Sequence, residues 1–283
     1  MMVNKAQVQK NFSQNAVTYD QYAVVQKEMA WKLLLKIRRT GQCFQNILEI
    51  GCGTGFLTEL LAREYPLAQI TATDIAPEMI VVAREKLAVF SNIKYFVADG
   101  ENLSVVDNES LDLSFDLIVS NAVFQWFTDY AAAFTQYHSY LEPGGYLIFS
   151  TFGAGTFKEL YICLKDGQKG KLPRKPDNHK THKKREPFIE NKYLQKVMIN
   201  TGFQHTGVEE VTKKEYFDSC RCFLRALKMI GAHNYLTEGL AAQGLGSGIF
   251  SLIKNYDAMF FSERGVPATY QCLFGWGRRT TNM

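Results

Sequence analysis

Ile47-Leu48-Glu49-Ile50-Gly51-Cys52-Gly53-Thr54-Gly55 passes from an apolar run into a glycine-rich turn, and a helix-forming segment follows it. A parallel strand that is buried on both faces is apolar almost throughout, and glycines occur where a chain turns tightly and lets a ligand approach its backbone. Glu49 is the one carboxylate of the run, and at the end of such a strand it must face something polar. The stretch therefore predicts a strand, a ligand-binding turn and a helix, the arrangement of a nucleoside-cofactor site.

The spacing of the glycines distinguishes two classes of cofactor site. Dinucleotide sites follow G-x-G-x-x-G, in which the third glycine lets the helix pack closely while its N-terminus receives a pyrophosphate. Here Gly51, Gly53 and Gly55 form G-x-G-x-G, which is one residue shorter. With Glu49 before it, the pattern resembles motif I of the class I S-adenosylmethionine (SAM) methyltransferases, whose cofactor carries a sulfonium and no phosphate. A tight strand-to-helix turn without a ligand is the alternative.

A second carboxylate closes the next expected strand, Gln69 to Asp74. Asp74 lies nineteen residues beyond Gly55, where a carboxylate can accept hydrogen bonds from both hydroxyls of a ribose. An isolated Asp at this place is often a helix N-cap instead. Pro77 favours a helix start just afterwards, and Met79 is placed to give adenine an apolar floor.

Further strands also end on polar residues. The segment 93–101 predicts a third strand that closes on Asp99, which faces the adenine amino group in the methyltransferases. Phe115 to Asn121 predicts a fourth strand, and a helix end and the Pro143-Gly144-Gly145 turn lead into a fifth. Ligands of open α/β sheets bind beyond the carboxyl ends of the strands. We therefore expect SAM to contact Glu49, Gly51, Cys52, Gly53, Asp74, Ile75, Met79, Asp99, Gly100, Glu101 and Asn121, and the resemblance to the methyltransferases adds Tyr19.

The resemblance to the class I methyltransferases implies an α/β fold, a Rossmann-like seven-stranded class I methyltransferase sheet with helical cap additions. Phe188 to Gly202 predicts an amphipathic helix, Phe203 to Phe217 a strand, and Ala268 to Gly277 a last strand, which the resemblance implies to be antiparallel. We divide the chain into an N-terminal helical lid (1–45), a SAM-binding core (46–153), a basic insertion (154–186), a core helix and strand (187–217), a helical cap insertion (218–266), and a final core strand and tail (267–283).

The composition excludes several classes of protein. With 283 residues, 46% hydrophobic and 21% charged, the chain can bury a full core as one elaborated domain. No run approaches the roughly 20 apolar residues of a membrane span, and the N-terminus lacks the apolar core of a signal peptide, so we expect a cytoplasmic protein with no membrane partner. The six cysteines form no C-x-x-C pair and the five histidines no H-E-x-x-H spacing, so we expect no metal site.

Positive charge is concentrated in one segment. Between Lys165 and Arg185, nine basic residues stand against two acids, a net charge of +7, whereas the whole chain carries +4 and the remainder therefore sums to −3. A solvated loop is the plain interpretation. Charges this dense repel one another, however, so a polyanionic partner, either nucleic acid or an acidic protein, is the alternative.

The N-terminal segment predicts two helices, one from Asn4 to Ala16 and one that begins at Asp20 and runs toward Ile37. Tyr19 and Tyr22 lie near the junction, and packing on the helix surface is one interpretation of this pair. In the other interpretation Tyr19 closes over the methionine end of SAM, as this segment does in similar methyltransferases. An aromatic face suits a sulfonium because cations are attracted to ring quadrupoles.

Three further stretches are specific to a narrower family than motif I, which the whole superfamily shares. They are Arg225 to Ala232, Pro267-Ala268-Thr269-Tyr270, and Val123-Phe124-Gln125-Trp126. With the Asn4-Lys5, Phe12-Ser13 and Tyr19-Asp20 positions, they resemble the malonyl-acyl-carrier-protein O-methyltransferases of biotin synthesis, the BioC family, from about residue 3 to residue 277. The resemblance implies methyl transfer from SAM to the free carboxylate of a malonyl thioester on acyl carrier protein, before fatty-acid synthesis lengthens the chain toward pimelate.

The implied chemistry needs little acid-base machinery. A malonyl carboxyl has a pKa of ~4 or below and is ionised at neutral pH, so no general base is required. Attack of a carboxylate on a sulfonium destroys both charges, and a dry site with aromatic walls favours it. We expect Tyr19 and Trp126 to act in catalysis as walls, and Arg225 and Lys228 to orient the carboxylate or its thioester. For Trp126 a role in core packing is the alternative.

The implied partner, acyl carrier protein, is strongly acidic and suits a docking site on the basic segment through Lys180, Lys183, Lys184 and Arg185. Two other functions stay open. One is methylation of RNA or of a small metabolite, although Ser120-Asn121-Ala122-Val123 lacks the Pro-Pro-aromatic motif of amino-methylating nucleic-acid enzymes, which disfavours a nucleic-acid partner. The other is a SAM-binding docking protein without catalysis, although motif I is complete.

Overall fold

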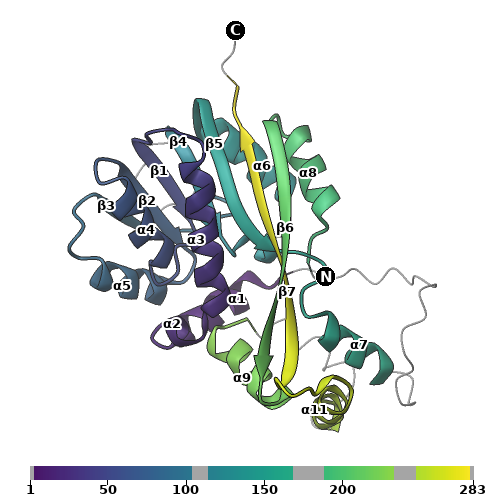
Figure 1. The fold of residues 1–283 in the computed structure, drawn as a ribbon. Coiled ribbons are helices and arrows are strands. Elements are labelled where there is room, and N and C mark those ends of the chain that lie inside the picture. The colour runs from purple at the N-terminus through teal and green to yellow at the C-terminus, as the bar shows by residue number, and fades with distance from the viewer. Residues whose placement is uncertain (1–2, 104–113, 168–187, 233–246, 281–283) are drawn as a thin grey trace.

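The fold is built on a seven-stranded sheet in the order β3-β2-β1-β4-β5-β7-β6 (Figure 1). A computed structural model of the chain describes residues 3–103, 114–167, 188–232 and 247–280. The strands are β1 (Asn46–Ile50), β2 (Gln69–Asp74), β3 (Ile93–Val97), β4 (Phe115–Asn121), β5 (Leu141–Phe152), β6 (Gln204–Phe217) and β7 (Val266–Arg278). The α/β fold with seven strands, predicted from the sequence, is confirmed.

The strands β1 to β5 run parallel, and β7 inserts antiparallel between β5 and β6, as predicted. In the middle of the sheet, Ile47 of β1 lies beside Ile70 of β2 on one side and Leu117 of β4 on the other. All three side chains are fully buried. Because the strands are parallel, the residues that follow them in sequence meet at one edge of the sheet.

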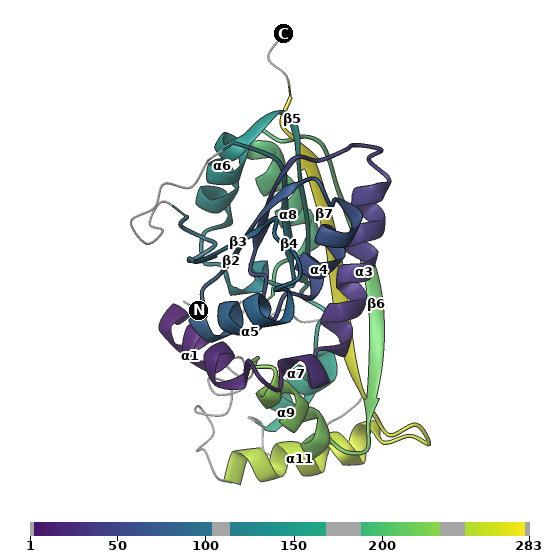
Figure 2. The same cartoon turned by 90° about the vertical axis from the view of Figure 1, so that its left-hand side faces the viewer.

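Helices cover both faces of the sheet. One face carries α3 (Val24–Arg38), α4 (Phe56–Glu64) and α5 (Pro77–Lys86), and the other carries α6 (Tyr130–Tyr140) and α8 (Asn191–Asn200), as Figures 1 and 2 show. A hydrophobic core lies on each face of the sheet, and successive residues of β4 point to alternate cores. Leu117 and Val119 pack on the α3 side, and Ile118 packs on the α6 side. This alternation is the two-residue period of a strand.

The remaining helices among the described residues gather beyond the carboxyl ends of the parallel strands (Figure 2). They are α1 (Lys5–Asn15), α2 (Tyr19–Tyr22), α7 (Lys158–Gly167), α9 (Cys220–Met229) and α11 (Ser247–Phe260), together with a short 3₁₀ helix, η1 (Phe124–Trp126). These elements roof the edge of the sheet where the cofactor site is expected. Within the described ranges, no helix has the length and apolarity that crossing a membrane requires.

The N-terminal helices differ from the prediction at one junction. The sequence predicts one helix from Asp20 toward Ile37, whereas the chain forms α2 and then α3, with a break at Ala23 (φ −83°, ψ 42°). Ala23 is fully buried, so the break is packed into the core. It separates α3, which packs along the sheet, from α2, which brings Tyr19 to the sheet edge.

One other prediction is corrected. Pro143-Gly144-Gly145 lies inside β5 as a bulge, because the register shifts from Phe115 opposite Leu141 to Leu117 opposite Tyr146. The described part of the predicted basic insertion contains a helix, α7, whose buried Glu159 accepts a hydrogen bond from the Thr269 backbone N–H of β7. This contact joins residues 110 positions apart, which is why the local sequence does not reveal it.

Candidate active site

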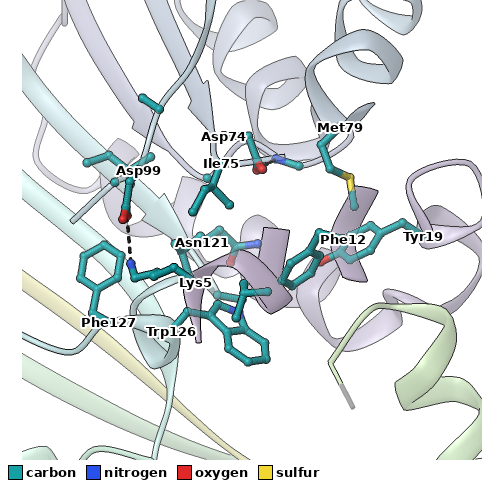
Figure 3. A pocket seen from close by; sticks show the side chains of 18 residues that line it. Lys5, Phe12, Tyr19, Asp74, Ile75, Met79, Asp99, Asn121, Trp126 and Phe127 are labelled. Atoms are coloured by element: carbon teal, nitrogen blue, oxygen red, sulfur yellow. Dashed lines mark hydrogen bonds and ion pairs between the residues drawn. The ribbon is translucent and has the colours of Figure 1, made fainter. Parts of the chain in front are cut away.

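A pocket with an empty volume of about 620 Å³ opens at the carboxyl ends of the parallel strands (Figure 3). We call it the first pocket. Its walls come from the glycine turn after β1, the residues after β2, β3 and β4, and the roof formed by α1 and Tyr19. The first pocket therefore lies where the sequence predicts the cofactor.

The glycine turn forms one wall of the first pocket. Gly51 and Gly53 both have positive φ, +70° and +55°, a conformation that residues with a Cβ rarely adopt. A Cβ on Gly51 would lie 2.2 Å from a methyl carbon of Val123, whereas a Cβ on Gly53 would meet no atom within 4 Å. Gly51 is therefore required by packing against the segment after β4, and Gly53 keeps open space toward the pocket.

Asp74 lines the first pocket at the end of β2. Its carboxylate accepts hydrogen bonds from the backbone N–H groups of Gly53 (2.9 Å) and Ala76 (2.8 Å). Burial raises the pKa of Asp74 to about 6, so the group is mainly ionised at neutral pH. The sequence suggested either a helix N-cap or a ribose-binding carboxylate at Asp74. The carboxylate accepts a hydrogen bond at the start of α5, as a cap would, and it also faces the pocket, where a ribose could bind.

Asp99 and Glu101 differ in their relation to the first pocket. Asp99 lines it, and one oxygen, Oδ1, accepts hydrogen bonds from Lys5 Nζ (2.9 Å) and the Glu101 N–H (3.0 Å). Glu101 does not line it; its carboxylate binds Lys5 Nζ (2.7 Å) and the backbone N–H and hydroxyl of Thr128 (both 2.8 Å). Although burial opposes its ionisation, these donors hold the pKa of Glu101 below its usual value.

Besides Glu101, two other residues expected at the cofactor lie outside the lining of the first pocket. Glu49 is 1% exposed and does not line the first pocket. Burial raises its pKa to about 8, so Glu49 is mainly protonated at neutral pH. Cys52 is also buried, where its side chain packs with Ala72 and Ile80 away from the pocket lining. The remaining predicted cofactor residues, Tyr19, Gly51, Gly53, Asp74, Ile75, Met79, Asp99, Gly100 and Asn121, do line the first pocket.

A second pocket, with an empty volume of about 380 Å³, adjoins the first. Four residues line both pockets: Phe12, Tyr19, Ala122 and Trp126. The ring of Phe12 lies 6.2 Å from that of Tyr19 and meets Trp126 edge to face at 5.6 Å between centroids. Beyond this aromatic junction, the second pocket is walled by further aromatic side chains, among them Phe157 and Tyr270.

Polar groups in the second pocket are few and neutral. Gln125 is held in place, because its side-chain oxygen accepts from the Thr151 hydroxyl (3.0 Å) and its amide donates to the Ala122 carbonyl (2.6 Å). The half-buried side-chain amide of Gln26 has no hydrogen-bond partner among the described residues. Burial, together with the nearby carboxylate of Asp74, raises the pKa of Tyr19, so its hydroxyl stays a donor. In the described part of the chain, no Lys, Arg or His lines this pocket.

The two cations predicted to act in catalysis lie outside both pockets. Arg225 and Lys228 are exposed on α9, and it is Leu227 and Ile230 of the same segment that line the second pocket. Of the predicted catalytic residues, Tyr19 and Trp126 line both pockets. The basic residues predicted to dock the carrier, Lys180, Lys183, Lys184 and Arg185, lie outside the described residues.

From the sequence, Lys5 and Phe12 were noted only as positions of the family resemblance, and neither Phe127 nor Gln26 was given a role. Lys5, Phe12 and Phe127 line the first pocket, with Lys5 Nζ 4.8 Å from the centre of the Phe127 ring, and Gln26 lines the second. A lone lysine or glutamine on a helix has no spacing that marks it as functional. The amphipathic pattern of the N-terminal helices could have indicated that they contribute to the site, because the apolar face of such a helix must cover some part of the protein.

Comparison with known proteins identifies the family. A family model described as "Methyltransferase domain" matches residues 48–149. The malonyl-[acyl-carrier protein] O-methyltransferase of Acetivibrio thermocellus is 36% identical over 284 aligned residues, which cover 98% of this chain and 95% of that protein. The chain belongs to the malonyl-[acyl-carrier protein] O-methyltransferase family. The protein of the same name from Bacillus anthracis is also 36% identical, covering 96% of this chain and 97% of the relative.

Solved structures support the fold of this family member. A methyltransferase from Bacillus halodurans superposes with a TM-score of 0.57 at 16% identity, covering 88% of this chain and 99% of that one. Haemonchus contortus phosphoethanolamine N-methyltransferase 2, solved in complex with S-adenosyl-L-methionine, has a TM-score of 0.52 at 18% identity, covering 88% of this chain and 52% of that one. The predicted methyltransferase sheet is thereby confirmed.

Proposed function

We propose that the protein transfers the methyl group of SAM to the free carboxylate of a malonyl thioester carried by acyl carrier protein, an early step of biotin (pimeloyl) synthesis. The relatives of that name match the chain over nearly its whole length. The observation that carries the proposal is the junction between the two pockets, where Phe12, Tyr19 and Trp126 are shared by both. A donor in one pocket and an acceptor in the other would meet at these rings.

The residues of the first pocket fit SAM better than they fit a dinucleotide. Asp74 and Asp99 both line it, and a carboxylate suits a ribose hydroxyl or an adenine amino group but repels a pyrophosphate. Lys5, the cation among the described lining residues, is already paired with Asp99. Asp74 would hold the ribose, Asp99 the adenine, and Ile75 and Met79 would supply the apolar contacts. When bound, SAM supplies an electrophilic methyl group on a cationic sulfur.

The second pocket fits the acceptor. The malonyl carboxylate is ionised without help from the protein, which agrees with a described lining that contains no histidine. The aromatic walls exclude water, which would otherwise stabilise the carboxylate relative to the transition state. Tyr19 and Gln26 offer a hydroxyl and an amide donor that orient the carboxylate without neutralising it, since a full positive charge would weaken the nucleophile. Trp126 is then a wall of the site.

Recruitment of the carrier is a separate part of the proposal. We place one contact on the basic segment around Lys180, Lys183, Lys184 and Arg185, whose charge complements an acidic carrier. Replacing these four residues by Ala should raise the KM for the carrier-bound substrate and leave the affinity for SAM unchanged. An unchanged KM over a range of salt concentrations would remove this segment from the proposal.

The direct test is methylation by the purified chain with methyl-labelled SAM. Malonyl-acyl carrier protein, malonyl-CoA and tRNA would be offered in parallel, with acetyl-acyl carrier protein as a control that lacks the free carboxylate. We expect label in the malonylated carrier as a base-labile methyl ester and none in the acetylated carrier. Label in tRNA, or equal labelling of both carriers, would refute the proposal.

A further inference from the structure

Helix α9 has two chemically different faces. Cys220, Phe223 and Leu227 are buried, whereas Arg221, Arg225 and Lys228 are exposed. At 3.6 residues per turn, the three cations fall within an arc of about 60°, and Phe223 and Leu227 point to the other side. We call Arg221, Arg225 and Lys228 the α9 cation stripe. The helix itself carries no acid.

The charge of the α9 cation stripe is not neutralised within the described residues. None of the ion pairs there includes Arg221, Arg225 or Lys228. Two acids lie at the start of the helix: Asp218 is exposed just before it, and Asp257 of α11 accepts a hydrogen bond from the Cys220 N–H. Three cations on one exposed helix face favour an anionic partner.

The stripe lies close to the proposed acceptor site. The opposite side of α9 contributes Leu227 to the second pocket, and Ile230 and Ala232 directly after the helix also line it. A helix with its side chains is about 10 to 12 Å across, so the stripe lies about one helix width from this pocket. Figures 1 and 2 place α9 on the same side of the molecule as α1 and α2, which roof the site.

We propose that the α9 cation stripe is a docking surface for the acidic carrier protein that delivers the thioester to the second pocket. The inference rests on the proposed function and deepens it. A carrier protein is far too large to enter a pocket of about 380 Å³, so it must rest on the rim while its acyl group reaches inside. Exposed rim cations would mainly speed and orient this encounter. Arg225 and Lys228 then act on the carrier and not on the reacting carboxylate.

The test compares two substrates that differ in the carrier. One is malonyl-acyl carrier protein, and the other is malonyl-N-acetylcysteamine, which has the same thioester but neither protein nor phosphate. The variant is R221E/R225E/K228E. Its matched control is K192E/K196E, which reverses two exposed lysines on α8, on a face of the sheet remote from α9. Titration with S-adenosylhomocysteine and thermal unfolding verify that both variants are folded.

We expect the triple variant to lose about ten-fold in kcat/KM on the carrier substrate, through KM, with a weaker dependence on salt than the unaltered protein shows. Turnover of malonyl-N-acetylcysteamine should not change, and the control should behave like the unaltered protein with both substrates. Equal losses on the two substrates would place the cations in the chemistry and overturn the inference. So would an unchanged KM for the carrier, or an effect on tRNA binding alone. Failure of the unaltered protein to methylate the malonylated carrier would instead refute the proposed function.

Discussion

The Nζ atom of Lys5 lies 2.9 Å from Oδ1 of Asp99 (Figure 3). Lys5 opens α1, and Asp99 follows β3, so this ion pair joins the N-terminal helix to the wall of the first pocket. Glu101 shares the same ammonium at 2.7 Å, and the ring of Phe127 lies beneath it. The contact holds α1 over the pocket and leaves Oδ2 of Asp99 available for a ligand.

Removing this ion pair should weaken cofactor binding. For Lys5→Met we expect about a five-fold rise in the Kd for S-adenosylhomocysteine, because a partly exposed charged contact contributes roughly 1 kcal/mol. Lys5→Arg keeps the charge and should retain most of the affinity. Calorimetric titration measures the change, with Lys10→Met on the exposed side of α1 as control. Tighter binding by Lys5→Met would show that the lysine competes with the cofactor for Asp99.

The two glycines of the turn should respond differently to alanine. In Gly51→Ala the new Cβ would overlap Val123 and also adopt a left-handed conformation, so we expect a loss of at least about 2 kcal/mol in the free energy of unfolding. In Gly53→Ala only the conformational strain applies, because the space is open. This variant should lose less stability but bind S-adenosylhomocysteine poorly. Equal denaturation midpoints for the two variants would contradict the packing argument.

Glu49 should make stability depend on pH. Its pKa is about 8 in the folded chain against 4.5 for an ordinary glutamate, so the folded state holds the proton more tightly. The contribution of Glu49 to the free energy of unfolding is therefore fully present below pH 4.5. It is lost as the pH rises through 8, at up to about 1.4 kcal/mol per pH unit. Asp74 acts in the same direction between 3.8 and about 6.

Glu49→Gln tests this assignment because the amide resembles the protonated acid in shape. Urea denaturation from pH 6 to 8 should show a decline in the unaltered protein that is largely absent in Glu49→Gln. An identical decline in both proteins would mean that Glu49 ionises normally in the fold.

We expect Gln26 to affect the reaction of the malonyl acceptor and not the affinity for the cofactor. Gln26→Leu removes a donor that we place at the malonyl carboxylate, and a hydrogen bond to a charged group contributes about 1.5–3 kcal/mol, so kcat/KM for the malonyl substrate should fall by more than ten-fold. The affinity for S-adenosylhomocysteine should not change. Gln21→Leu, at an exposed position of α2, serves as the control. Full activity of Gln26→Leu would exclude this residue from the acceptor site.

Local sequence patterns were sufficient to predict the strands and the polar residues that follow them. Gly51, Gly53, Asp74, Asp99 and Asn121 come directly after or close to apolar runs, and parallel strands necessarily bring such positions to one edge of the sheet. The antiparallel last strand and the family membership were predicted from the resemblance to a known family. The strands and the polar residues that follow them depend on residues that are close in sequence, so local patterns along the chain reveal them.

Only the tertiary structure decided which side chains enter the pockets. Glu49 points into the protein interior although it lies in motif I, and Arg225 and Lys228 face outward although their helix lines the second pocket. Lys5 meets a partner 94 positions away. The direction of a side chain depends on the element that packs against its own, and that packing is set by the burial of apolar faces between segments distant in sequence.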